Sequence, residues 1–162
     1  MNAPSKGHSE IRLIPLTAAY IDIAASIHAA AFGAEAWNRR ALAELLAMPG
    51  AQGRLALNEA DIPVGFSLSL FVVDTAELLT LAVNPGSRRR GVGRHLVREF
   101  LECANSALAT NAFLEVAEDN LPAISLYNRL GFCFESRRPD YYRREGNIRV
   151  AASVLRHPLT QI

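Results

Sequence analysis

A cluster of arginines and glycines in the middle of the chain has the composition of an anion-binding loop. Residues 81–96 read LAVNPGSRRRGVGRHL, a strand-like apolar run followed by a turn and the start of a helix. Free backbone N–H groups and the positive dipole end of a helix favour a phosphate, and Gly91 and Gly93 have no Cβ to block its approach. A Walker loop is excluded because Val92 and Gly93 replace its Lys-Ser/Thr pair, and Leu96 replaces the third glycine of a dinucleotide fingerprint. The stretch by itself fits equally well a glycine-started helix with a solvated basic face.

Two further side chains, those of Glu115 and Tyr127, could move protons. Glu115 lies in the apolar run FLEVA, where a buried carboxylate is costly unless it is paired or functional. The alternative is a glutamate at the sheet edge that pairs with an arginine. Tyr127 shares one face of an expected helix with Ala123, Leu126 and Leu130, so it could also be a core tyrosine with a satisfied hydroxyl. Since a phenol with a pKa near ~10 is protonated at pH 7, this side chain could donate a proton.

The overall composition limits the class of protein. The chain has 162 residues, of which half are hydrophobic, and a formal net charge of +1, which gives no general case for binding nucleic acid. Cys103 and Cys133, without a Cys/His cluster, exclude a zinc framework and require no disulfide. The start of the chain lacks the apolar core of a signal peptide, and no apolar stretch approaches the ~20 residues that span a bilayer. We expect a disordered tail over residues 1–10 and one domain over 11–162, cytoplasmic, metal-free, without nucleic-acid or membrane partners, and monomeric or homodimeric.

Hydrophobic periodicity predicts the elements that would position these side chains. Strands are expected at residues 11–16, 54–58, 64–73, 77–83, 113–117, 132–136 and 148–155. Helices are expected at residues 18–32 and 91–108, and from an Asn38 cap to residue 48. A further helix follows an Asn120 cap, carries Pro122 in its first turn and stops at Gly131. The order is β-α-α-β-β-β-α-β-α-β-β.

Read together, the glycine-rich segment and the residues that follow it resemble a known superfamily. The pattern R-x-x-G-x-G at residues 88–93 and the run LEVAEDNLPAISLYNRLGF at 114–132 resemble the GNAT superfamily of acetyl-CoA-dependent N-acetyltransferases. The motif N-x-x-A-x-x-L-Y-x-x-L-G-F from Asn120 and the run LLTLAVNPGSRRRGVG are similar to its RimI type, the alanine N-acetyltransferases of small-subunit ribosomal proteins. The resemblance implies an α/β (α+β) fold with a mixed sheet of about seven strands, splayed between the fourth and fifth strands, and four flanking helices.

The same resemblance implies where acetyl-CoA, the co-substrate, would bind. Backbone amides of the loop would hold its pyrophosphate: Arg88, Arg89, Arg90, Gly91, Val92, Gly93 and Arg94. The pantetheine arm would be bonded or flanked by Leu81, Ala82, Val83, Asn120, Ala123 and Tyr127. The phosphates therefore belong to a coenzyme that is held and not cleaved, and no metal is implied.

Acetyl transfer to an amine requires a base, an oxyanion-binding group and an acid for the departing thiolate. The resemblance gives Glu115 as the base and Tyr127 as the acid. Glu77 is the alternative base, because other branches of the superfamily place one at the start of that strand, and a water chain could connect either carboxylate to the amine. A backbone N–H near Ala82 or Val83 would stabilise the oxyanion.

The amine acceptor is expected between the first two helices and the last hairpin. Trp37 would form one wall, although it could simply anchor the core, and Tyr141 and Tyr142 are expected in the last turn region, with Glu77 also bordering the acceptor. Arg149 stands where the family commonly has an aspartate, which is a departure at the amine end of the site. The isolated histidines His28, His95 and His157 are interpreted as structural.

Three functions are compatible with these residues. The favoured one is acetylation of a protein N-terminus, possibly that of a ribosomal protein, because an α-amine with a pKa of ~7.7–8.0 is neutral more often than a lysine at ~10.4. A small amine such as an aminoglycoside, a polyamine or an amino acid is the alternative acceptor. A regulator that binds acetyl-CoA without turnover is disfavoured, because Glu115 and Tyr127 are both polar.

Overall fold

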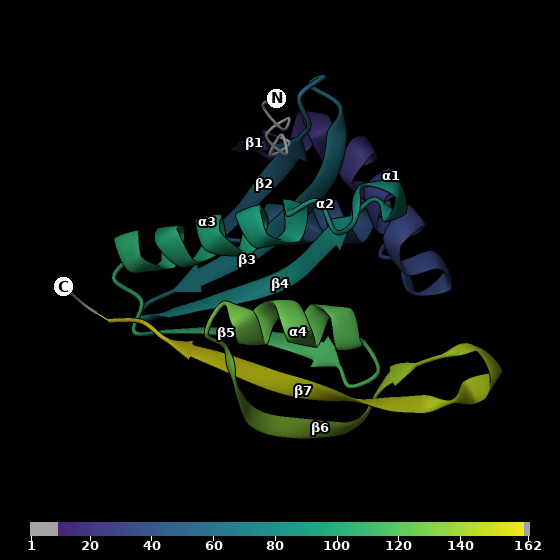
Figure 1. Cartoon of the computed structure of the whole chain (residues 1–162), viewed down its shortest axis with the longest axis vertical. Helices are drawn as coiled ribbons and strands as arrows, with labels where there is room; N and C mark the ends of the chain where they lie inside the picture. Colours follow the sequence, from purple (N-terminus) through teal and green to yellow (C-terminus); the bar gives the residue numbers. More distant parts are fainter. Residues whose placement is uncertain (1–9, 161–162) are drawn as a thin grey trace, which may run out of the picture.

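A seven-stranded mixed sheet with helices on both faces organises the molecule (Figure 1). The computed structural model describes residues 10–160. Its elements are β1 (Arg12–Pro15), α1 (Ile21–Phe32), α2 (Arg39–Leu46), β2 (Ala51–Leu57), β3 (Pro63–Val72), β4 (Thr75–Val83), α3 (Val92–Ser106), β5 (Asn111–Ala117), α4 (Leu121–Arg129), β6 (Cys133–Arg143) and β7 (Arg149–Pro158). The strand order is β1-β2-β3-β4-β5-β7-β6, and only the β4–β5 pair is parallel. The predicted fold class and order of elements are confirmed.

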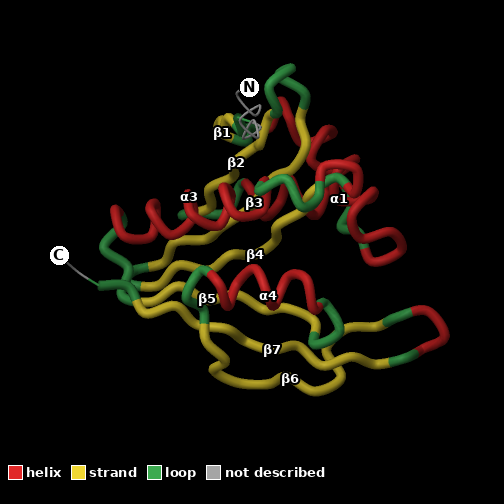
Figure 2. The backbone as a smooth tube through the Cα atoms, viewed as in Figure 1, coloured by secondary structure: helices red, strands yellow, loops and turns green. Residues whose placement is uncertain are grey.

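The sheet opens between β4 and β5. These strands pair only from Thr75 opposite Asn111 to Leu78 opposite Leu114, and then diverge (Figure 2). The cause lies in β4, whose pairing with β3 shifts register at Leu79. Because side chains alternate between the faces of a strand, an extra residue also exchanges the faces of those that follow. The predicted splay between the fourth and fifth strands is therefore present.

The two faces of the sheet carry separate hydrophobic clusters. Helices α3 and α4 cover one face, and their cluster includes Val97, Phe100, Leu114, Tyr127 and Phe132 (Figure 1). Helices α1 and α2 cover the other face, and their cluster includes Ile21, Ile27, Leu42, Leu55 and Phe66. The exchange of faces at Leu79 is visible here, since Leu78 belongs to the first cluster and Ala82 to the second.

The helix boundaries follow the predicted caps. The Asn38 side chain accepts a hydrogen bond from the Ala41 N–H at 2.9 Å and begins α2. The Asn120 side chain accepts one from the Ala123 N–H at 3.4 Å and begins α4. Helix α4 is followed by Gly131, whose φ of +92° suits glycine.

The prediction for the last hairpin is wrong in one respect. Strand β6 was expected to end near residue 136 but continues to Arg143, so Tyr141 and Tyr142 lie in the strand and not in the turn. The polar segment containing Pro139 suggested a loop. An edge strand that is exposed along nearly its whole length tolerates both charge and proline, because one side of its backbone has no partner strand.

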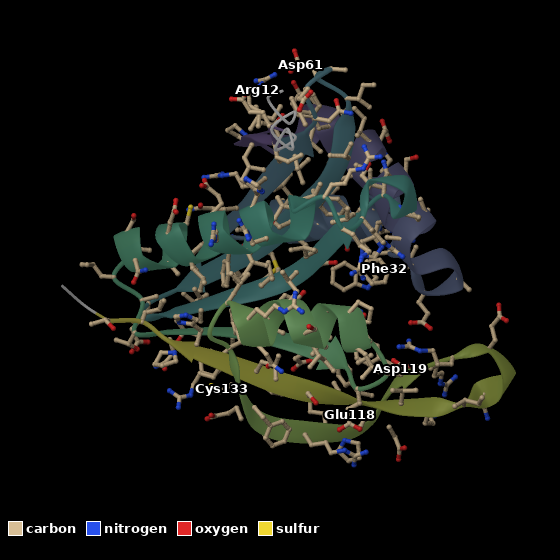
Figure 3. The ribbon with its side chains drawn as sticks, in the orientation of Figure 1. Arg12, Phe32, Asp61, Glu118, Asp119 and Cys133 are labelled. Carbon is tan, nitrogen blue, oxygen red and sulfur yellow. The ribbon has the colours of Figure 1, made fainter. Side chains whose placement is uncertain are left out.

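Some expectations concern features that the described residues only partly test. No helix within residues 10–160 is long and apolar enough to cross a membrane. Over the same residues no group of three or more His, Cys, Asp or Glu side chains could hold a metal ion. Cys103 and Cys133 are both free, and Cys133 is exposed on β6 (Figure 3). The expected disordered tail lies, except for Glu10, outside the described residues.

Candidate active site

Residues 84–94, which we call the glycine loop, bring free backbone amides to the start of α3. Gly91 is the N-cap residue and has a φ of +84°, a conformation that favours glycine. A Cβ at this position would meet nothing closer than His95 Nδ1 at 3.7 Å, so the backbone angle and not lack of space requires the glycine. The N–H groups of Val92, Gly93 and Arg94 open the helix and have no carbonyl one turn earlier within it. The loop therefore presents the free amides that an anion site requires, and its binding of a phosphate stays a prediction.

Gly93 has a packing role that the sequence did not reveal. A Cβ on Gly93 would lie 3.1 Å from Leu126 Cδ2 of α4, which is tighter than ordinary contact. The residue therefore lets α3 and α4 approach each other, a role distinct from the phosphate approach expected of it. The arginines Arg88, Arg89, Arg90 and Arg94 are all exposed, and Arg88 donates to the Ala31 carbonyl at 3.3 Å.

Where β5 diverges, one edge of β4 keeps unused backbone groups. The Asn84 N–H donates to Val64 O of β3 at 2.8 Å, and Ala82 lies opposite Phe66 in the same ladder. Because hydrogen-bonding direction alternates along a strand, the Ala82 amide also faces β3. The amides of Leu81 and Val83 consequently face the gap. Of the two amides expected to stabilise an oxyanion, that of Val83 is the one in position to do so.

Two carboxylates, Glu77 on β4 and Glu115 on β5, lie on the same face of the sheet beside this gap. The Glu115 carboxylate is 3.1 Å from the Arg138 guanidinium of β6, and its side chain is 18% exposed. Burial raises the pKa of Glu77, and the negative charge of Glu115 raises it further. The ion pair expected as the alternative role for Glu115 therefore forms, although its arginine reaches across β7 from the edge strand.

The two tyrosines of β6 complete what we call the carboxylate cluster: Glu77, Glu115, Arg138, Tyr141 and Tyr142. A register shift puts Arg138 opposite Ala152 and Tyr142 opposite Val150, so the strand bulges between them. The tyrosine rings meet edge to face with centroids 5.0 Å apart, and the Arg138 guanidinium lies 5.7 Å from the Tyr141 centroid. Burial and a hydrogen bond to Glu115 raise the pKa of Tyr141, and burial raises that of Tyr142 to about 12. Sequence reasoning found both tyrosines but missed Arg138.

Tyr127, on α4, lies in the hydrophobic cluster that α3 and α4 form on the sheet, and its hydroxyl keeps its proton. Its residue is 8% exposed, and its ring meets that of Phe132 edge-on at 5.9 Å. Burial raises the pKa of its hydroxyl, and the nearby Tyr142 adds to the effect. Ala123, Leu126 and Leu130 pack against the same cluster, as expected from their spacing. Tyr127 is therefore a core residue, and it also carries the protonated phenol that a proton donor requires.

Comparison with known proteins supplies the family. The model of the Acetyltransferase (GNAT) family matches residues 21–132, well over half of the chain. The chain belongs to this family. The ribosomal protein bS18-alanine N-acetyltransferase of Salmonella typhimurium is 35% identical over 88 residues, a match that covers 54% of this chain and 60% of that relative. The chain thus spans less than two-thirds of the relative's length in this match.

Solved structures agree with the fold. A crystal structure of the ribosomal-protein-alanine N-acetyltransferase from Escherichia coli has a TM-score of 0.86 at 24% identity, and the match covers 94% of this chain and 96% of that one. Arabidopsis thaliana NAA60 in complex with acetyl-CoA has a TM-score of 0.81 at 18% identity, covering 93% of this chain and 99% of that one.

In this GNAT chain, Trp37 is not a buried anchor. It is 37% exposed, and its ring stacks on that of His28 with centroids 5.3 Å apart. The backbone N–H of Trp37 donates to His28 Nδ1 at 3.0 Å, so the other ring nitrogen carries the proton and donates to Thr80 Oγ1 at 3.1 Å. Burial lowers the pKa of His28 to about 4. His28 is therefore a structural residue, as expected, and it fixes the segment that carries Trp37.

Arg149, the departure from the family pattern, does not reach the carboxylates. It donates to the Asp140 carbonyl at 3.4 Å, within the bulge of β6. Asp140 has a φ of +55°, so the arginine supports an unusual turn of the strand backbone. The cation that takes part in the carboxylate cluster of this GNAT chain is Arg138 and not Arg149.

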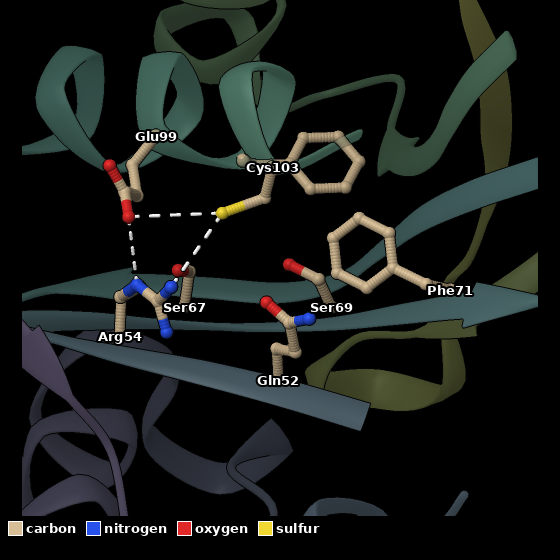
Figure 4. A pocket seen from close by; sticks show the side chains of 8 residues that line it. Gln52, Arg54, Ser67, Ser69, Phe71, Glu99 and Cys103 are labelled. Atoms are coloured by element: carbon tan, nitrogen blue, oxygen red, sulfur yellow. Dashed lines mark hydrogen bonds and ion pairs between the residues drawn. The ribbon is translucent and has the colours of Figure 1, made fainter. Parts of the chain in front are cut away.

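A small polar cavity lies elsewhere, between α3 and strands β2 and β3 (Figure 4). Its volume of about 10 Å³ has room for about one water molecule. Arg54 lies at its wall, 2.9 Å from Glu99 and 3.6 Å from Cys103 Sγ. Burial raises the pKa of the Cys103 thiol, which keeps it protonated and unreactive. No residue of the glycine loop or the carboxylate cluster lines this cavity.

Proposed function

We propose that this chain transfers the acetyl group of acetyl-CoA to the N-terminal α-amine of a protein in the cytoplasm. A ribosomal-protein N-terminus beginning with alanine is the first candidate acceptor. The observation that carries the proposal is the opening between β4 and β5, which has free strand amides, two carboxylates and a protonated phenol around it. Family membership and the named relatives support the same chemistry.

Acetyl-CoA would be bound mainly by backbone groups. The amides of the glycine loop, with help from Arg88, Arg89, Arg90 and Arg94, would take the pyrophosphate. The exposed edge of β4 at Leu81 and Val83 would bond the pantetheine arm. The start of α4, with Asn120 and Ala123, would flank the same arm. This arrangement would deliver the thioester to the gap without a metal ion.

Each chemical step then has a residue. Glu115, directly or through water, takes a proton from the ammonium group, and the neutral nitrogen attacks the thioester carbon. The Val83 N–H stabilises the oxyanion that forms. When the carbon–sulfur bond breaks, the thiolate takes its proton from Tyr127, which burial keeps protonated. The second proton that the nitrogen has to lose passes through water to the Tyr127 oxygen and restores the phenol. The products are the amide, free CoA and the one proton that Glu115 returns to solvent.

An α-amine suits this site better than a lysine as the acceptor. Glu115 would take the proton while it lies 3.1 Å from the Arg138 guanidinium. An α-amine with a pKa of ~7.7–8.0 already has a neutral fraction at pH 7, whereas a lysine at ~10.4 has almost none. Glu77, whose pKa is raised and which has no ion pair among the described residues, is the alternative base.

Peptide acetylation with a defined set of acceptors tests the proposal. The purified chain is incubated with acetyl-CoA and three peptides: one with a free N-terminal alanine, one with a blocked N-terminus and an internal lysine, and one with both amines free. Tandem mass spectrometry should place the added acetyl group on the α-amine in the first and third peptides. Acetylation of spermidine, free alanine or an aminoglycoside in place of the peptides would overturn it. Binding of acetyl-CoA without transfer to any amine would overturn it in favour of a regulator.

A further inference from the structure

Arg144 joins three segments of the chain that lie far apart in sequence. It follows β6, in the turn between β6 and β7. Its Nε and Nη2 donate to the two carboxylate oxygens of Asp119, after β5, at 3.0 and 2.7 Å. Its Nη1 donates to Glu35, in the short turn Gly33–Glu35 between α1 and α2. The three contacts use the planar fork that only arginine offers.

The contacts of Arg144 continue to the carboxylate cluster. Its guanidinium lies 5.5 Å from the centroid of the Tyr142 ring, and Tyr142 meets Tyr141 edge to face at 5.0 Å. The Tyr141 ring in turn lies 5.7 Å from the Arg138 guanidinium, which pairs with Glu115 at 3.1 Å. A continuous series of packed cations and rings therefore runs from Arg144 to the proposed base.

We propose that Arg144 is a positioning residue for acceptor binding, which holds the hairpin against the α1–α2 turn so that Tyr141 and Tyr142 stay beside Glu115. The inference rests on the proposed function, because it takes this face as the place where the amine binds. Arg144 itself touches neither carboxylate of the gap and takes no part in proton transfer.

The position of the hairpin explains why such a contact is needed. Strand β6 is exposed along nearly its whole length, and the tip of the hairpin extends beyond the rest of the sheet (Figure 1). Its bulge between Arg138 and Tyr142 interrupts the pairing with β7 just before the tip. Phe32, at the end of α1, and Asp119 lie at the same end of the sheet (Figure 3). A guanidinium that contacts Asp119 and the α1–α2 turn fixes the tip from both sides.

The chain offers a matched control in the same hairpin. Arg137 donates to both carboxylate oxygens of Glu118, the residue next to Asp119, at 2.6 and 3.2 Å. Among the described residues it pairs with Glu118 and contacts neither the tyrosine rings nor the α1–α2 turn. Replacing Arg137 therefore removes an ion pair of the same type without breaking the series that leads to Glu115.

The test compares Arg144→Gln, Arg144→Lys and Arg137→Gln with the parent. For Arg144→Gln we expect the KM for an alanine-starting peptide to rise roughly 10- to 100-fold, the cost of misplaced binding groups. The Kd for acetyl-CoA should be unchanged, and kcat should fall less than KM rises. Arg144→Lys should recover only part of the loss, and Arg137→Gln should match the parent.

Other outcomes overturn the inference. Parent kinetics in Arg144→Gln, or equal losses in Arg144→Gln and Arg137→Gln, would remove the positioning role. A parallel fall in Tm, kcat and acetyl-CoA binding would show a merely structural role.

If the parent acetylates no α-amine, the proposed function fails and hydrogen exchange decides the inference separately. Faster exchange across residues 138–148 in Arg144→Gln, but not in Arg137→Gln, would still show that Arg144 holds the hairpin in place. Unchanged exchange would overturn it.

Discussion

The glycine loop and the carboxylate cluster are built in opposite ways. The loop is one continuous segment whose functional groups are backbone amides, fixed by the left-handed φ of Gly91 and by the start of α3. The cluster takes side chains from three strands and depends on a register shift in β4 and another in β6. A backbone site is therefore local in the sequence, whereas the cluster exists only when the whole sheet has the correct register.

This difference predicts different responses to substitution. The loop should tolerate changes of side chain and fail when its backbone angle is disturbed. The cluster should fail when a single polar atom is exchanged, even when shape and packing are preserved. The following experiments would break or sharpen that contrast, beginning with the largest expected effect.

The isosteric change Glu115→Gln should give the largest loss. If Glu115 is the general base, turnover should fall on the order of 10²–10⁴-fold, because an amide cannot accept the proton. The Kd for acetyl-CoA should stay near the parent value, since the carboxylate does not contact the glycine loop. Steady-state kinetics together with calorimetric binding of acetyl-CoA would measure both quantities.

Glu77→Gln is the matched control on the neighbouring strand. It should lower turnover less than Glu115→Gln. The reverse ranking would give the base role to Glu77, whose raised pKa also predicts that the acid limb of the activity profile lies above the ordinary range of a glutamate.

Tyr127→Phe should separate proton donation from packing. The ring and its contact with Phe132 remain, while the proton available to the thiolate is lost. Turnover should fall by about 10²–10⁴-fold with acetyl-CoA affinity preserved. Melting temperature should change little, because the substitution keeps the ring and its packing against Phe132. A variant destabilised by about 1–3 kcal/mol with normal turnover would instead show a buried hydrogen bond and remove the acid role.

In the glycine loop, Gly91→Val should abolish acetyl-CoA binding while the proposed base Glu115 and acid Tyr127 stay in place. A β-branched residue strains a φ of +84°, so the amides would no longer converge. Acetyl-CoA at a hundred times its Kd should stabilise the parent by about 2.7 kcal/mol in thermal unfolding, and the variant should lose this shift. Gly86→Ala is the control in the same loop, because a Cβ there meets nothing within 4 Å and no positive φ is involved. A normal shift in Gly91→Val would remove the loop from the coenzyme site.

The same contrast explains how much the sequence could predict. The order of elements, the caps at Asn38 and Asn120 and the glycine loop depend on neighbours within a few residues, and the structure agrees with each. The partnership of Arg138 with Glu115 depends on which strands flank β7, and no local pattern encodes that. The ion pair of Arg144 with Glu35 joins residues that are 109 positions apart, so no local pattern predicts it either.

One error and one missed role have equally physical causes. The end of β6 was placed too early because proline and charge normally mark a loop, whereas an exposed edge strand accepts both. The packing role of Gly93 was missed because its sequence context is that of an anion loop, and its place in the coenzyme site stays a prediction. Its proximity to Leu126 depends on how α3 packs on α4, which is a property of the assembled core.

The smallest expected effect is on the stability of the fold at low pH. It tests whether the segment that carries Trp37 depends on a neutral His28. Burial lowers the folded-state pKa of His28 from the usual 6.5 to about 4, so the unfolded chain binds more protons between these values. Its contribution to stability is then complete above pH 6.5 and is lost as pH falls towards 4, at no more than about 1.4 kcal/mol per pH unit. Protonation would also give Nδ1 a hydrogen, so it could no longer accept the hydrogen bond from the backbone N–H of Trp37. Urea unfolding between pH 8 and 4 should therefore show a shallower acid decline in His28→Gln than in the parent, whatever the stability of the variant at pH 8. Equal slopes would mean that carboxylates elsewhere, and not this histidine, make the fold sensitive to acid.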